Sequence, residues 1–127
     1  MKVIIHRHGK SLELTASSPG VEDLVALCEE QLQAADGMLR LATTPALIQQ
    51  IREEEVAVEI VYSRPATFTV SFNRQTLHPL RLLIPLTGDL AGAVTTIFHG
   101  KTQYEAGPYR NRKGTAEIVA LVARLSG

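Results

Sequence analysis

The sequence predicts one α+β domain: an antiparallel sheet of about five to seven strands with helices packed mainly on one face, as a two-layer sandwich. Two observations carry this prediction. Apolar side chains alternate with polar ones through much of residues 56–98, which is the period of strands that bury one face. Segments with apolar residues at helical spacing lie before and after that stretch. Because 127 residues are enough for one core, we treat 1–127 as a single domain.

The chain is predicted to begin with a β-hairpin followed by a helix. Residues 2–6 and 12–15 have strand-like patterns and flank a turn that contains Gly9. A helix is then expected over residues 19–36, because Ser18 and the proline after it are typical of a helix start. Gly37 is well placed to end this helix in a left-handed conformation.

A second helix is predicted over residues 45–54. Thr44 followed by Pro45 repeats the combination of a capping residue and a proline at the first helical position. The apolar residues of this segment form a narrow face, as expected for a helix at the surface of a domain. Residues 38–42, before this helix, are expected to be a strand or an extended connection.

Four strands are predicted between the second helix and residue 98. Pro85 cannot donate a ladder hydrogen bond, so it indicates an edge position or a bulge. Glu59 interrupts an otherwise apolar strand, and we expect it to form a cross-strand ion pair with Arg81 in preference to acting as a catalytic acid. The predicted strands are residues 56–62, 68–72, 80–84 and 94–98.

The last part of the chain contains a polar loop, a short strand and a closing helix. Residues 99–114 hold several glycines, a proline and many polar side chains, and residues 103–106 could add one short strand. Thr115 is expected to cap the last helix, in which Glu117 near the start and Arg124 near the end both complement the helix dipole.

Composition narrows the classes of function. The net charge is zero, with 13 basic and 13 acidic residues, so nothing in the overall charge favours nucleic acid or an acidic membrane. Residues 1–55 carry five basic and nine acidic side chains, a balance of −4, and residues 56–127 carry eight and four, a balance of +4. The lone Cys28 excludes an internal disulfide, and neither a signal-peptide core nor a membrane span is present. We therefore expect a cytoplasmic protein that is not embedded in a membrane.

Candidate catalytic and metal-ligating residues are few. His6 and His8 would leave the same face of a strand, which suits a metal pair, but His78 and His99 have no fixed distance from them. Cys28 lies on the apolar stripe of the first helix, where it behaves as a small hydrophobic residue. The sequence has no nucleophile elbow of the G-x-S-x-G type. We therefore predict no metal, no cofactor and no catalytic residue.

The basic loop of residues 99–114 is the candidate binding segment. It places four cations and two tyrosines around the single anion Glu105, and it leads into the free N–H groups at the start of the last helix. Its glycines match neither the Walker nor the dinucleotide-binding spacing. The predicted ligand- or partner-binding residues are Lys101, Tyr104, Tyr109, Arg110, Arg112 and Lys113.

Two classes of function remain open at this point. The first is a non-enzymatic binding or interaction domain that contacts an unknown protein through the sheet face or the basic loop. The alternative is a small enzyme or ligand-binding protein that holds an anionic small molecule at the basic loop and the N-terminus of the last helix. An enzyme would need a cleft in which Glu59 or a histidine meets the basic loop, whereas a binding domain would not.

A homodimer is a further expectation. It could form through the second face of the sheet or by pairing of edge strands. The residues predicted on that second face are Thr67, Thr69, Ser71, Arg81, Leu83, Thr95 and Ile97.

Overall fold

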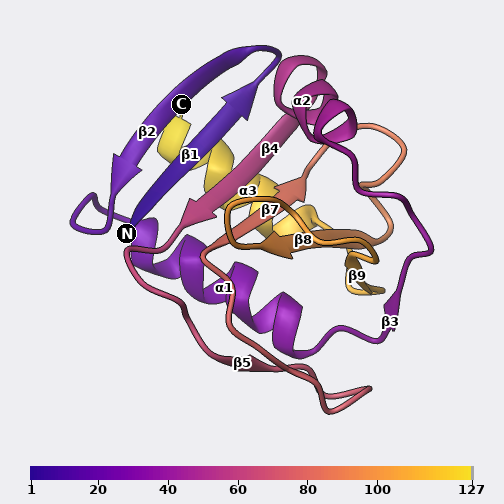
Figure 1. The fold of residues 1–127 in the computed structure, drawn as a ribbon. Helices are drawn as coiled ribbons and strands as arrows, with labels where there is room; N and C mark the ends of the chain where they lie inside the picture. Colours follow the sequence, from indigo (N-terminus) through magenta and orange to yellow (C-terminus); the bar gives the residue numbers. More distant parts are fainter. Residues whose placement is uncertain (127) are drawn as a thin grey trace.

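The structure is a computed structural model, and it describes residues 1–126. It confirms the predicted α+β class, with helices on an antiparallel sheet (Figure 1). No helix in the part of the chain that the structure describes is long and apolar enough to cross a membrane. In chain order the elements are β1 (Lys2–Arg7), β2 (Lys10–Thr15), α1 (Val21–Gln33), β3 (Gly37–Met38), α2 (Pro45–Glu54), β4 (Val56–Val61), β5 (Phe68–Thr69), β6 (Thr76–Leu77), β7 (Arg81–Pro85), β8 (Thr95–Gly100), β9 (Tyr109–Asn111) and α3 (Ala116–Ser126).

The main sheet has seven strands in the order β2-β1-β4-β7-β8-β9-β3, and each neighbouring pair is antiparallel. In Figure 1, β2 forms one outer edge and β4 and β7 lie near the middle. The register sets Glu59 of β4 opposite Leu83 of β7, and Val61 opposite Arg81. Side chains two apart on one strand share a face, so Glu59, Leu83 and Arg81 all lie on the same face of the sheet.

The larger core lies between the sheet and the helices α1 and α3. Val3, Val58, Leu82 and other side chains of alternate strand positions pack there against the apolar faces of the two helices. The smaller core lies on the opposite face, under α2. Its buried members are Ile48, Ile51, Ala57, Leu83, Phe98 and Tyr104.

The helix α2 has the predicted bounds and the predicted cap. The hydroxyl of Thr44 accepts a hydrogen bond from the backbone N–H of Leu47 at 3.1 Å, and Pro45 occupies the first turn. The ends of α1 differ from the prediction. Gly20, with φ 84°, precedes the first helical residue, and no side chain caps this end. Gly37 does not end the helix in a left-handed conformation; it lies in β3, and a Cβ there would approach Nε of Arg110 to 2.7 Å.

The predicted strand at residues 68–72 in the main sheet is wrong. Only Phe68 and Thr69 are extended, and they pair with β6 in a separate two-stranded sheet. The reason is that Ser71 donates from both its backbone N–H and its hydroxyl to the carbonyl of Gln33, at 2.9 and 2.8 Å. The segment therefore satisfies an orphan carbonyl at the C-terminus of α1 and leaves the main sheet.

Two other expectations about the strands are also wrong. Pro85 is at the end of a central strand: β8 pairs with β7 only over Arg81 to Leu83, so the missing N–H of Pro85 costs no ladder bond. The predicted second face is mixed, because Ile97 is buried in the core under α1 and α3. Thr67, Thr69 and Ser71 lie outside the main sheet altogether.

Candidate functional site

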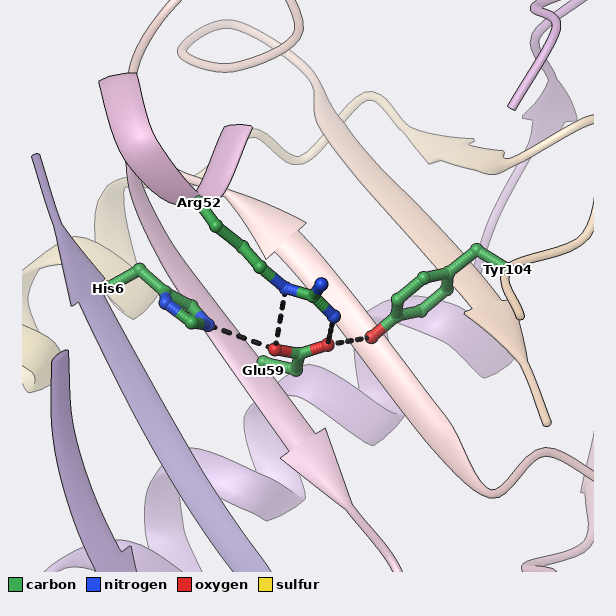
Figure 2. A network of polar contacts seen from close by, with 4 residues as sticks. All are labelled: His6, Arg52, Glu59 and Tyr104. Atoms are coloured by element: carbon green, nitrogen blue, oxygen red, sulfur yellow. Dashed lines mark hydrogen bonds and ion pairs between the residues drawn. The ribbon is translucent and has the colours of Figure 1, made fainter. Parts of the chain in front are cut away.

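A buried carboxylate lies at the centre of the sheet face that α2 covers. The Glu59 side chain is 3% exposed and accepts hydrogen bonds from three residues (Figure 2). His6 Nε2 donates to Oε1 at 2.9 Å, and the Tyr104 hydroxyl donates to Oε2 at 2.6 Å. Arg52 donates from Nε to Oε1 at 3.2 Å and from Nη2 to Oε2 at 2.6 Å. We call these four residues the Glu59 cluster.

The expected ion pair between Glu59 and Arg81 is absent. Glu59 pairs instead with Arg52, which the preceding element, α2, brings over the sheet. An ionised carboxylate offers about four lone-pair sites, and the four donors of the cluster use all of them. Glu59 therefore has no site left to accept a proton from a substrate, and its role is to hold Arg52 and Tyr104 in place.

The cluster keeps Glu59 ionised. Burial alone would raise the pKa of Glu59, but hydrogen bonds from His6, Arg52 and Tyr104, together with the charge of Arg52, lower that pKa from 4.5 to about 2. Burial lowers the pKa of Arg52, yet the hydrogen bonds and charge of Glu59 outweigh this and raise it. Burial, and then the charge and hydrogen bond of Glu59, raise the pKa of Tyr104. All three groups therefore keep a fixed charge near neutral pH.

Tyr104 reaches the cluster because the chain turns sharply after β8. Gly100 forms an isolated bridge with Tyr104, and Glu105 donates a backbone hydrogen bond to the carbonyl of His99 at 2.9 Å. A Cβ at Gly100 would lie 2.0 Å from the carbonyl oxygen of Gln103. Glycine is required here because the turn folds back directly onto the strand. The Tyr104 ring then packs edge-on against Phe98, with ring centroids 6.4 Å apart.

A cavity of about 220 Å³ lies beside the cluster, between the start of α2, β7 and the turn after β8. Arg52 and Tyr104 of the cluster line it, and so does Arg81. We call it the Arg81 cavity. Its lining residues are Thr43, Thr44, Pro45, Ile48, Gln49, Arg52, Arg81, Thr102, Gln103 and Tyr104.

Arg81 is a lining residue with a buried polar group that lacks a hydrogen-bond partner. Within residues 1–126, its Nε is buried and makes no hydrogen bond, and the side chain takes part in no ion pair with a carboxylate. The hydroxyl of Thr43, on the same cavity, is also buried without a partner. Buried donors are normally satisfied, and a charged donor left without an acceptor is costly. Two such groups on one cavity are open to partners that the described chain does not supply.

Two other hollows on the described part of the chain lack this feature. One of about 340 Å³ lies between Leu47 on α2 and Leu90 in the loop after β7, and its charged lining residues are the acidic Glu55 and Asp89. Another, of about 260 Å³, is lined by His78, His99 and Lys101, and His99 contacts Glu105 at 3.2 Å. Burial lowers the pKa of His99, and the charge of Glu105 only partly opposes this.

The six residues predicted as a binding segment do not converge on one site. Tyr104 lines the Arg81 cavity, whereas Lys101 lines the hollow beside His99. Tyr109 is buried in the larger core and accepts a hydrogen bond from Asn73 at 3.2 Å. Arg110 and Arg112 lie 3.8 and 3.7 Å from the carboxylate of Asp36, and Lys113 lies 3.1 Å from Glu117.

The start of α3 is covered by the loop before β8. Thr115 is 3% exposed and donates from its backbone N–H to the carbonyl of Gly92 at 3.1 Å. A Cβ at Gly114 would lie 2.8 Å from the same oxygen. The N–H groups that the sequence suggested as an anion site are thus close to the chain's own backbone.

The histidines and the cysteine have structural surroundings. His8 bonds through Nδ1 to the carbonyl of Glu54 at 2.8 Å, while His6 belongs to the Glu59 cluster. No group of three or more metal-ligating side chains occurs among residues 1–126. Cys28 is buried in α1, and desolvation, helped by the charge of Glu29, raises its pKa to about 12. Its thiol is therefore a poor nucleophile.

Comparison with known proteins adds no assignment: no protein-family model, curated protein or solved structure matches this chain. The site must therefore be interpreted from its own chemistry. Sequence patterns had drawn attention to Glu59, Arg81 and Tyr104 one at a time, but they had not singled out Arg52. The Thr44-Pro45 helix start was the one signal that could have placed Arg52 on the inner side of α2, one turn after Ile48.

Proposed function

We propose that this protein is a binding domain that holds a small anion in the Arg81 cavity. The observation that carries the proposal is the buried Arg81 Nε, which has no acceptor within residues 1–126 and lies on a cavity. An anion would supply that acceptor and would balance the guanidinium charge. The cavity lies on a sheet face, and the sequence suggested that a binding domain would make its contact either there or through the basic loop.

Binding is favoured over catalysis by the side chains that line the cavity. No carboxylate, imidazole, thiol or amine is among them in the described chain. The Tyr104 hydroxyl is already bonded to Glu59, which lies behind it. General acid–base chemistry needs a group within reach of the substrate that can change its protonation state near working pH. The cavity offers fixed charge and hydrogen-bond donors, which suit recognition. A cytoplasmic setting is part of this proposal, and the buried, inert thiol of Cys28 is compatible with it.

Replacement of Arg81 is expected to weaken anion binding. In Arg81→Gln the side chain stays polar but becomes shorter and loses the guanidinium charge and fork. Hydrogen bonds to charged groups contribute about 1.5–3 kcal/mol, so affinity for a small anion should fall about 10- to 100-fold. Acetate, phosphate and sulfate can be titrated at constant ionic strength while the amide and Arg Nε signals are followed by NMR.

Arg64→Gln is the matched control, because Arg64 is exposed, lies in the connection after β4 and is not part of the cavity. Both variants change the net charge by −1. Equal affinities in the two variants, or anion-induced shifts that avoid Arg81, would place binding elsewhere and refute the site.

A homodimer through β2 is a second element of the proposal. The strand pairs with β1 along one edge, and no other strand of residues 1–126 pairs with its outer edge. Leu12 on this strand is 41% exposed. Edge strands with exposed apolar residues favour pairing with a second copy. We expect light scattering to give a dimer for the native chain and a monomer for Leu12→Lys; a native chain that stays monomeric at high concentration contradicts the pairing.

A further inference from the structure

We infer that the ligand of the Arg81 cavity is a small hydroxylated monocarboxylate, of the chemical class of sugar acids, and not a phosphate ester. This inference rests on the proposed function, since it specifies which anion the same cavity takes. Three features carry it: the net charge of the groups around the cavity, the geometry of the unpartnered donor, and the chemistry of the remaining walls.

The charge around the cavity matches a monoanion. Arg52 and Arg81 line the cavity and contribute +2, while Glu59, bonded to Arg52 at 2.6 Å, contributes −1. The sum of these three charges is +1. A carboxylate carries −1 and balances it, whereas a phosphate ester carries about −1.5 to −2 at neutral pH. The lining residues supply no further cation to pair with the excess charge of a phosphate.

The unpartnered donor has the shape that a carboxylate fits. A guanidinium presents its N–H groups in a planar fork, which pairs with the two oxygens of a carboxylate in two parallel hydrogen bonds. In Arg52 this fork is already used: Nε and Nη2 both bond to Glu59. Arg81 is the arginine of the cavity whose Nε side has no acceptor in the described chain. The cavity therefore has one guanidinium, that of Arg81, that can pair with one carboxylate of a ligand.

The remaining walls are polar but uncharged. Thr44, Gln49, Thr102 and Gln103 line the cavity together with Thr43, whose buried hydroxyl has no partner. Hydroxyl and amide side chains both donate and accept, which suits a ligand that carries several hydroxyl groups. Because Thr44, Gln49, Thr102 and Gln103 are exposed, an aliphatic acid would displace water from them without replacing its hydrogen bonds, and this costs affinity. The apolar contribution is small and comes from Ile48 and Pro45.

The size of the cavity matches a single small unit of a ligand. A volume of 220 Å³ equals that of about seven molecules of liquid water, at about 30 Å³ each. This suits one hydroxylated ring or a short chain, and it excludes nucleotides and oligosaccharides as ligands that fit entirely within the cavity.

Calorimetric titration with four matched compounds tests the inference. At about pH 8, where free imidazole is largely neutral, and at constant ionic strength, the native chain is titrated with glucuronate, glucose 6-phosphate, glucose and hexanoate. Glucuronate has both the carboxylate and the hydroxyl groups, and each of the others lacks or changes one feature. We expect glucuronate to bind about 10-fold or more tightly than each of the other three.

Variants connect the selectivity to Arg81. Arg81→Gln should reduce glucuronate affinity about 10- to 100-fold and leave it no better than glucose, while Arg64→Gln should keep the native selectivity. Arg81→Lys retains the charge without the fork, so it should lose most of the preference for the carboxylate.

The outcomes separate this inference from the proposed function. Tighter binding of glucose 6-phosphate, lost in Arg81→Gln, overturns the monocarboxylate but leaves an anion-binding cavity. Equal binding of hexanoate and glucuronate overturns the hydroxylated class alone. Failure of glucuronate, glucose 6-phosphate and hexanoate all to bind, or binding that is the same in Arg81→Gln, overturns both proposals.

Discussion

Glu59→Gln is expected to lower the free energy of unfolding by about 3 kcal/mol. Removing one partner of a buried ion pair typically costs about 3–5 kcal/mol, because the other charge is left without its counterion. The low end applies here, since the Arg52 side chain is 29% exposed and water can partly solvate it. The glutamine amide also brings an N–H₂ group to a position that receives only donors. Guanidinium-chloride unfolding followed by circular dichroism measures the change.

Two comparisons show whether the loss comes from the buried pair. Glu13→Gln removes a carboxylate that lies 3.7 Å from Lys2 with both side chains well exposed, so it should cost no more than about 1 kcal/mol. The double variant Arg52→Gln/Glu59→Gln removes both charges. It should be less destabilised than the sum of the two single variants, because contacting residues are coupled. Additive effects, or a Glu59→Gln cost as small as that of Glu13→Gln, would mean that the cluster contributes little to stability.

The parts of the fold that local patterns determine were predictable. The strands that form β4, β7 and β8 follow from alternating apolar residues, because a strand that buries one face repeats every second residue. The helix α2 was predicted to its first and last residue by the capping threonine and the proline after it. In both cases the deciding contacts lie within a few positions of each other in the sequence.

The parts that failed depend on contacts between distant segments. The segment after β5 leaves the sheet because Ser71 bonds to Gln33, 38 positions earlier. No pattern within residues 68–72 indicates that Ser71 would bond to Gln33. Likewise, Glu59 and Arg81 lie on one face of the sheet, as the alternation predicted. The carboxylate of Glu59 bonds instead to Arg52, which α2 carries, and to Tyr104, which follows the turn at Gly100.

The candidate site illustrates the same limit for function. The basic loop attracted attention because its charges are close in the sequence, yet Asp36 and Glu117 lie within ion-pair distance of its arginines and of Lys113. The cation of interest, Arg81, is the first residue of β7, and the strand residues after it are apolar. Arg81 is important because its Nε has no hydrogen-bond acceptor in the described structure. A sequence pattern cannot indicate that such a partner is absent.

Acid should destabilise the native chain through Glu59 by about 3 kcal/mol. The pKa of Glu59 is lowered from 4.5 to about 2, and a difference of about 2.5 units at 1.36 kcal/mol per unit gives this magnitude. In this window the unfolded chain binds more protons than the folded chain, so stability rises with pH. The contribution is therefore complete above pH 4.5 and is lost as the pH falls from there towards about 2. Urea unfolding at several pH values between about 6 and about 2.5 follows the loss.

Glu59→Gln isolates this contribution from that of the other carboxylates, because the variant has no proton to gain at position 59. The native chain and the variant should differ by about 3 kcal/mol at about pH 6 and should converge as the pH approaches 2. A constant difference across the range would mean that the carboxylate is not held ionised by its four donors. Convergence would show that the stabilisation depends on the Glu59 charge, which is the same charge that neutralises Arg52 and leaves Arg81 to determine what the cavity binds.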